Sequence, residues 1–173
     1  MKPAAPQAAS VAALWKSYLA SLGDTPEATD RVFTAWHFCD TKESADGLVD
    51  LVLLGVKRAT AGSVAEYEAG TESMPLEGEL SVVTDGDGIA RCVIRTHRID
   101  VVPFDEVTAE FAQIGGEGDR SLSYWRRVHW DYYTRVLKPL GLKPTRDMPV
   151  VCEQFEVVFS PDLVNPMESW NVK

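Results

Sequence analysis

The sequence is poor in cysteine. Its three cysteines, Cys39, Cys92 and Cys152, are odd in number, far apart and outside any C-x-x-C spacing. This pattern argues against a disulfide framework and against a structural zinc site, so we expect no disulfide-linked partner. His37 and Cys39 could chelate a metal as a pair, but no third ligand lies nearby in the sequence, and we expect neither a metal nor a cofactor.

Long apolar runs are also missing. No stretch reaches the roughly 20 apolar residues of a membrane span. Residues 1–10 hold two prolines and four alanines without the apolar segment of a signal peptide. We therefore expect a cytoplasmic protein with no membrane partner and with a flexible N-terminal tail over residues 1–10.

Positive charge is in deficit over the chain as a whole. The 173 residues carry a formal net charge of −9, which opposes non-specific attraction to a nucleic-acid backbone. Residues 120–146 differ, because seven arginines and lysines stand there against Asp131 alone, a local charge of 7 − 1 = +6. Two interpretations stay open: a solvated helix face, or local steering of a nucleotide or short RNA.

Hydrophobic periodicity predicts helices and strands whose order does not alternate regularly. Helices are expected where apolar residues recur every three or four positions, and strands where β-branched residues gather. The expected helices are 10–22, 40–54, 104–113 and 121–137, and the expected strands begin at 60 and cover 79–84, 89–102 and 150–159. Ser10, Asp40 and Ser121 are the expected N-caps.

This order excludes a doubly wound sheet. It favours an α+β fold with a small, mostly antiparallel β-barrel flanked by helices. With no repeat and no linker in the sequence, we expect one domain over residues 11–160 and a C-terminal tail over 161–173.

The stretch Gly55-Val56-Lys57-Arg58-Ala59-Thr60 is the best lead to chemistry, because it places a lysine and a hydroxyl where a helix ends and a strand should begin. A threonine hydroxyl needs a base to become a nucleophile. In a regular strand positions 57 and 60 point to opposite faces, so the two side chains converge only if the backbone turns between them. In the alternative interpretation Lys57 is a solvated residue beside a helix end and Thr60 simply starts a strand.

Several features occur together along the chain. They are Trp36-His37-Phe38, the G-x-K-x-x-T stretch at 55–60, the strand pair at 79–102, the segment from Glu117 to His129 and the closing strand with Phe155. In this order they resemble the ASCH domain family, small domains with a β-barrel similar to the PUA domains that bind RNA.

The resemblance implies a nucleic-acid or nucleoside function. Members are described as RNA binders, as a ribonuclease and as an amidohydrolase that deacetylates N4-acetylcytidine. In the amidohydrolase branch a lysine and a threonine of the G-x-K-x-x-T stretch act with a glutamate, which implies catalytic roles for Lys57 and Thr60. The glutamate matches Glu117 after a one-residue shift in its loop. We expect a nucleoside or single-stranded RNA in a barrel pocket, with hydrolysis as the outcome; a non-catalytic RNA-binding module and a ribonuclease are the alternatives.

Further residues are candidates for ligand contacts. They are Trp36, Phe38, Tyr67, Asp119, Trp125 and His129. The four aromatic side chains could stack on a nucleobase, or they could pack in the core. Asp119 could instead cap the following helix, and His129 could be a hydrogen-bonded core histidine.

Glu153 is out of place in its strand. It falls on the inward face with Val151 and Phe155, where a carboxylate is costly unless it is paired or used. An inward arginine such as Arg95 could pair with it, or Glu153 could belong to a functional site.

Overall fold

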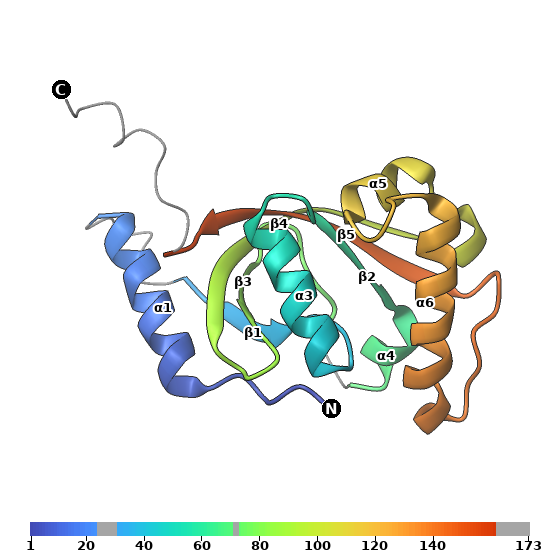
Figure 1. Ribbon diagram of the computed structural model, residues 1–173, viewed down its shortest axis with the longest axis horizontal. Helices are drawn as coiled ribbons and strands as arrows, with labels where there is room; N and C mark the ends of the chain where they lie inside the picture. Colours follow the sequence, from blue (N-terminus) through green and yellow to red (C-terminus); the bar gives the residue numbers. More distant parts are fainter. Residues whose placement is uncertain (24–30, 71–72, 162–173) are drawn as a thin grey trace.

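Five strands form one curled, mixed sheet in the order β1-β3-β4-β5-β2 (Figure 1). The computed structural model describes residues 1–23, 31–70 and 73–161. The strands are β1 (Phe33–His37), β2 (Ala59–Ser63), β3 (Leu80–Thr84), β4 (Ala90–Pro103) and β5 (Pro149–Phe159). β1 runs parallel to β3, and the other three pairings are antiparallel. The predicted α+β class and mostly antiparallel sheet are therefore confirmed, and the sheet curls into a half-barrel.

Helices cover both faces of the sheet. The helices are α1 (Ala8–Ser21), α3 (Lys42–Leu53), α4 (Val64–Glu68), α5 (Ala109–Gly115) and α6 (Leu122–Val136), with 3-10 turns η1 (Phe104–Glu106) and η2 (Lys138–Leu140). α1 packs against Leu80 and Val82, whereas α3 packs against Val83 and Ile94. Because successive strand residues point to opposite faces, α1 lies on the outer face and α3 on the inner one. α5 and α6 form a further core with the β2–β5 end of the sheet.

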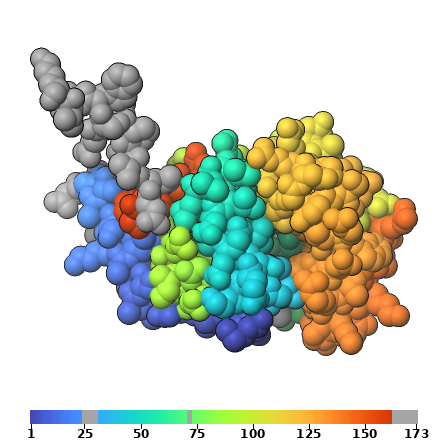
Figure 2. All heavy atoms as spheres, in the orientation of Figure 1, coloured from blue at the N-terminus to red at the C-terminus, as the bar shows by residue number. Residues whose placement is uncertain are grey.

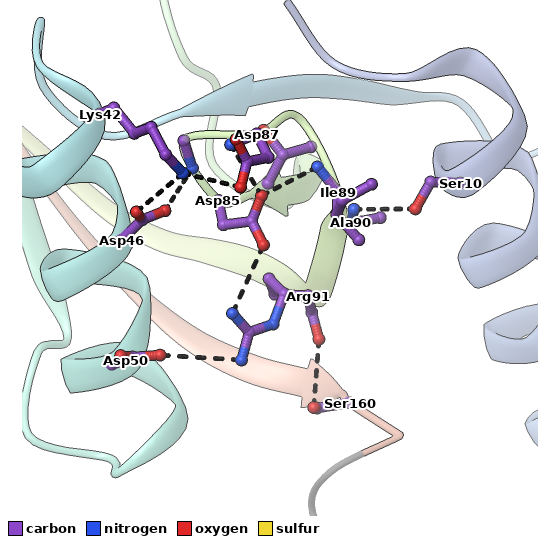
Figure 3. A network of polar contacts seen from close by, with 12 residues as sticks. Ser10, Lys42, Asp46, Asp50, Asp85, Asp87, Ile89, Ala90, Arg91 and Ser160 are labelled. Atoms are coloured by element: carbon purple, nitrogen blue, oxygen red, sulfur yellow. Dashed lines mark hydrogen bonds and ion pairs between the residues drawn. The ribbon is translucent and has the colours of Figure 1, made fainter. Parts of the chain in front are cut away.

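The β3–β4 turn is anchored to α3 by charged side chains (Figure 3). Lys42 Nζ lies 2.7 Å from Asp87 and 3.1 Å from Asp46. Arg91 bridges Asp85 at 3.5 Å and Asp50 at 3.7 Å. These contacts hold the hairpin against the helix that leads into the Gly55–Thr60 stretch.

The N-terminal residues are held in place, although the sequence predicts a flexible tail over 1–10. Ala4 N donates to Gly86 O at 2.9 Å and Gln7 N donates to Gly88 O at 2.8 Å. α1 begins at Ala8 with Gln7 as N-cap, and Ser10 accepts from Ala90 N instead of capping. The backbone pairing with the β3–β4 turn accounts for the order of this segment.

Helix starts were predicted with mixed success. Ser121 is the N-cap of α6, as predicted, and accepts from Tyr124 N. The predicted cap Asp40 is wrong, because Thr41 caps α3 by accepting from Ser44 N. Asp40 instead pairs with an arginine of α6, described below.

Two elements were not predicted, and one predicted helix is divided. The sequence did not predict strand β1 or the short helix α4. The segment 104–113, predicted as one helix, forms η1 and then α5. The predicted C-terminal tail lies outside the described residues from position 162 onward. Within the described part of the chain, no helix has the length and apolar character needed to cross a membrane.

Candidate functional site

A pocket of about 970 Å³ opens on the concave side of the sheet, between α3 and α6. Figure 2 shows these two helices, cyan and orange, side by side on the face turned to the viewer. Four strands supply its floor and walls, with Trp36 from β1, Thr60 from β2, Ser81 from β3 and Glu153 from β5. Its size matches the pockets that hold small organic ligands.

Lys57 is buried at this pocket with a side-chain exposure of 2 %. It lies in the link between α3 and β2, where Val56 N and Lys57 N both donate to Leu51 O. Its ammonium donates to Glu117 Oε1 at 2.6 Å and to Ala59 O at 2.8 Å. These partners offset the cost of removing the charge from water.

Glu117 reaches Lys57 because the loop after α5 approaches the α3–β2 link very closely. Gly116 has φ +75°, and a Cβ built there would lie 2.3 Å from Val56 O. Burial raises the pKa of the Glu117 carboxyl, but the charge of Lys57 and the hydrogen bond that Lys57 donates outweigh burial and hold the pKa below its ordinary value. Glu117 is therefore a carboxylate at neutral pH.

Thr60 also lines the pocket, as the second residue of β2. Lys57 precedes the strand, so the alternation of β2 does not govern its direction. Lys57 and Thr60, from one short stretch, and Glu117, from the loop after α5, line one pocket.

His129 lines the same pocket from α6. Its ring stacks on Trp125 at 4.1 Å, and Nδ1 lies 2.9 Å from Trp125 O. A carbonyl only accepts, so Nδ1 carries the proton and Nε2 of the neutral ring is an acceptor. Burial, opposed by the charge of Glu117, lowers the pKa of His129 to about 4, so the ring is neutral at pH 7.

Aromatic side chains form part of the pocket wall. Trp36 and Phe38 meet edge to face at 4.8 Å, and Lys57 Nζ lies 5.2 Å from the Phe38 ring centroid. Tyr67 packs over Gly62, where an added Cβ would lie 2.5 Å from the tyrosine hydroxyl. Three of the four predicted aromatic residues, Trp36, Phe38 and Tyr67, therefore line the pocket.

Two predicted ligand residues lie elsewhere. Trp125 is 3 % exposed in the core between α5 and α6, where it packs on Phe104 and Phe111. Asp119 is exposed, and its carboxylate accepts from Ser121 N at 2.9 Å at the start of α6. The Trp125 ring stacks on His129. Neither Trp125 nor Asp119 is among the residues lining the pocket.

Other charged residues at the pocket were not identified as site residues. Arg135 of α6 binds Asp40 through two hydrogen bonds of 2.8 and 2.9 Å and thereby links α6 to the β1–α3 loop. Glu66 accepts from Tyr132 Oη and forms a capping box with Ser63 at the start of α4. The Ser-x-x-Glu spacing in the sequence could have identified the capping box of Ser63 and Glu66. The Arg135–Asp40 pair had no such local signal, because its residues are 95 positions apart.

The pocket lining is acidic. The charged lining residues among those described are Lys57 and Arg135 against Glu66, Glu79, Glu117, Asp131 and Glu153. Their formal sum is 2 − 5 = −3. Of the seven basic residues in segment 120–146, only Arg135 contributes to the lining of the described pocket. Across the described residues, no group of three or more His, Cys, Asp or Glu side chains could hold a metal ion.

Residues 34–159 match the ASCH domain family. Among solved structures, the chain is similar to an ASCH domain from Lactobacillus crispatus JV V101, with 32 % identity, a TM-score of 0.79 and coverage of 86 % of this chain and 94 % of that one. It is also similar to a protein from Enterococcus faecalis V583, with 30 % identity, a TM-score of 0.78 and coverage of 88 % and 90 %. No curated protein matches the chain.

Proposed function

Because this chain belongs to the ASCH domain family, we propose that its pocket binds a nucleoside and hydrolyses an amide on the base, with N4-acylated cytidine as the substrate class. Lys57, Thr60 and Glu117 are the proposed catalytic residues. Trp36, Phe38, Tyr67 and His129 are the proposed ligand contacts, since they line the same pocket.

One observation carries the proposal. The three residues that the family resemblance implies come from two segments, the Gly55–Thr60 stretch and the loop that holds Glu117, yet all line one pocket, and Lys57 Nζ lies 2.6 Å from Glu117 Oε1. A merely solvated lysine would not be 2 % exposed with a carboxylate at that distance. Such a buried pair is typical of sites that transfer protons.

The first step forms an ester on Thr60. Thr60 Oγ1 attacks the acyl carbon. As it does so, its hydroxyl proton passes to Lys57 while Lys57 passes one of its own protons to Glu117 along their short contact, so Lys57 remains an ammonium and Glu117 becomes a carboxylic acid. When the tetrahedral intermediate collapses, the C–N bond breaks and Glu117 gives its proton to the leaving nitrogen.

The second step releases the acid. Water attacks the ester carbon, the pair accepts the water proton, and the C–O bond to Thr60 breaks as that oxygen regains a proton. The products are the free amine of the base and a carboxylic acid, so one water is consumed for each amide. Lys57, Thr60 and Glu117 end the cycle unchanged.

The test is turnover of N4-acetylcytidine, measured as free cytidine. Lys57→Met keeps the length of the side chain without its amine, and we expect a loss of roughly 100-fold or more, as for removal of an acid–base group. Lys143→Met is the matched control, since Lys143 is exposed. Absence of turnover by the wild-type protein, or equal rates for Lys57→Met and Lys143→Met, contradicts the proposal.

A non-catalytic RNA-binding module is the second candidate. It is favoured by exposed basic side chains on and beside α6, among them Arg120, Arg127, Lys138 and Lys143. Incubation with a single-stranded RNA oligonucleotide separates the candidates. Salt-sensitive binding without turnover of either substrate supports the module, and cleaved strands support a ribonuclease.

A further inference from the structure

We propose that Glu153 is the residue that recognises an exocyclic N–H on the bound base, so that the pocket prefers a cytosine-type base over a uracil-type one. This inference rests on the proposed nucleoside pocket and adds a specificity-determining residue to it.

Glu153 is buried within an apolar stretch of the sheet. It is 5 % exposed, and its neighbours on the same strand face, Val151 and Phe155, are fully buried. Its strand β5 is internal, between β4 and β2, and the side chain lines the pocket. A carboxylate in such a place costs free energy, so a role at the pocket is a physical reason for its presence.

The carboxylate is held in a defined position by Thr96. The Thr96 hydroxyl, 1 % exposed, donates to Glu153 Oε1 at 2.5 Å. The register between β4 and β5 shifts between Thr96 and Arg98, so that Thr96 faces Phe155 while Ile99 faces Glu153. This bulge allows a buried hydroxyl to approach the carboxylate from the neighbouring strand.

Arg95, the partner expected from the sequence, does not hold Glu153. Arg95 instead pairs with Glu156 on the opposite strand face, at 2.5 Å, and both of these side chains are about half exposed. The prediction that Arg95 pairs with Glu153 is therefore wrong, because Arg95 and Glu153 lie on opposite sides of the sheet.

Glu153 lies directly beside the proposed nucleophile. Thr60 and Glu153 are register partners on antiparallel strands, and such partners point to the same face with Cβ atoms about 4.5–5.5 Å apart. A base whose acylated nitrogen lies at Thr60 therefore brings its exocyclic N–H within reach of Glu153. An ionised carboxylate only accepts hydrogen bonds, so it favours an amino or amide N–H and repels a carbonyl oxygen in the same place.

Cytidine and uridine test this directly, since they differ mainly in a donor or an acceptor at the exocyclic position. Calorimetric titration of the wild-type protein should show cytidine binding at least about tenfold more tightly than uridine, the value of a hydrogen bond to a charged group. In Glu153→Gln the new amide can donate or accept, and the preference should fall to about threefold or less. Glu156→Gln, the same change on the opposite strand face, should keep the wild-type preference.

Thr96→Val provides a second measurement if Glu153→Gln does not fold by circular dichroism. Without the hydroxyl that positions Glu153, the preference for cytidine should fall at least about threefold. An unchanged preference in whichever variant folds, or equal binding of both nucleosides by the wild-type protein, overturns the role of Glu153.

The outcomes also separate this inference from the proposed hydrolase. A wild-type protein that prefers cytidine through Glu153 but does not hydrolyse N4-acetylcytidine supports the recognition role and contradicts the catalytic one. A wild-type protein that binds neither nucleoside overturns both.

Discussion

At the scale of single residues, the hydroxyl of Thr60 is the group on which the proposed chemistry depends. Thr60→Val keeps the branched shape and removes the hydroxyl, so N4-acetylcytidine hydrolysis should fall by roughly 100-fold or more. Thr60→Ser keeps a hydroxyl and should retain most of the activity. Steady-state rates of the three proteins, with cytidine binding measured beside them, decide the role of this residue.

Thr134→Val is a suitable control for that pair. Thr134 is exposed on α6, with its hydroxyl donating to Trp130 O at 2.7 Å, so its loss should leave the rate unchanged. Equal activity of Thr60→Val and Thr60→Ser would remove Thr60 from the mechanism while leaving the pocket itself intact.

His129 should make stability depend on pH. Its pKa is lowered to about 4 in the folded protein, against an ordinary value near 6.5, so below pH 6.5 the unfolded chain binds a proton that the folded protein does not. Stability is therefore lost as pH falls from 6.5 toward 4, by about 1 to 2 kcal/mol between pH 7 and pH 5. Urea unfolding at both pH values measures the loss.

Substitution should isolate the histidine. His129→Gln should show a smaller loss of stability between pH 7 and 5 than the wild-type protein, whereas His97→Gln, at an exposed position of β4, should not. Glu117 acts at lower pH, because its lowered pKa preserves its contribution until pH falls through that value. An identical pH 7 to 5 loss in His129→Gln and the wild-type protein would show that the ring is not buried in its neutral form.

At the scale of elements, the sequence predicted the helices and strands that short local motifs mark. It did not predict a strand that depends on pairing with a distant segment. The hairpin of β3 and β4 follows from Asp85-Gly86-Asp87-Gly88, and α6 follows from its Ser121 cap. β1 has five half-buried residues without regular alternation and is defined by parallel pairing with β3, more than 40 positions away. Such a strand leaves little trace in its own residues.

At the candidate site too, residues in short motifs could be predicted from the sequence, whereas contacts between distant strands could not. That Lys57, Thr60 and Glu117 share one pocket could be predicted because the resemblance supplies the short stretches that contain them; their catalytic roles stay a proposal. The partner of Glu153 could not be predicted, since Thr96 lies 57 positions away and reaches it only through a bulge in β4. A carboxylate on an apolar strand face was visible from sequence, but the group that holds it depends on strand register.

Gly116 is the glycine that joins two elements at the site. It ends α5 with φ +75°, and a Cβ there would lie 2.3 Å from Val56 O and 2.9 Å from Lys57 Cα. Gly116→Ala should therefore destabilise the protein by about 2 to 4 kcal/mol, above the 1 to 2 kcal/mol cost of the left-handed conformation alone. It should also lower N4-acetylcytidine turnover, because Glu117 is displaced from Lys57.

Gly141→Ala is the matched control. Gly141 has φ +72° at the end of η2, but nothing lies within 4 Å of its Cβ position. It should cost only about 1 to 2 kcal/mol and leave the rate unchanged. Chemical unfolding and turnover of both variants measure the difference, and equal destabilisation would mean that the close approach to Val56 does not constrain the loop.

At the scale of the whole molecule, charge separates the two candidate functions. The chain carries −9 overall and segment 120–146 carries +6, so the remainder is −9 − 6 = −15. The described pocket lining sums to −3, which disfavours several phosphates inside the pocket. An uncharged nucleoside meets no such repulsion, and the basic surface of segment 120–146 remains the place where RNA could bind.

Salt dependence should therefore differ between the two ligands. A nucleoside releases no condensed counterions, so cytidine affinity should change by less than about twofold between 50 and 500 mM salt. RNA held by the basic segment should weaken steeply, with a slope of log K against log salt of about −0.7 for each phosphate neutralised. Titration of both ligands over that range, for the wild-type protein and for the double variant Arg127→Gln/Lys138→Gln, measures the slopes.

The double variant should flatten only the RNA slope, because neither side chain is among those lining the pocket. A salt-sensitive cytidine affinity would instead place the nucleoside on the basic surface.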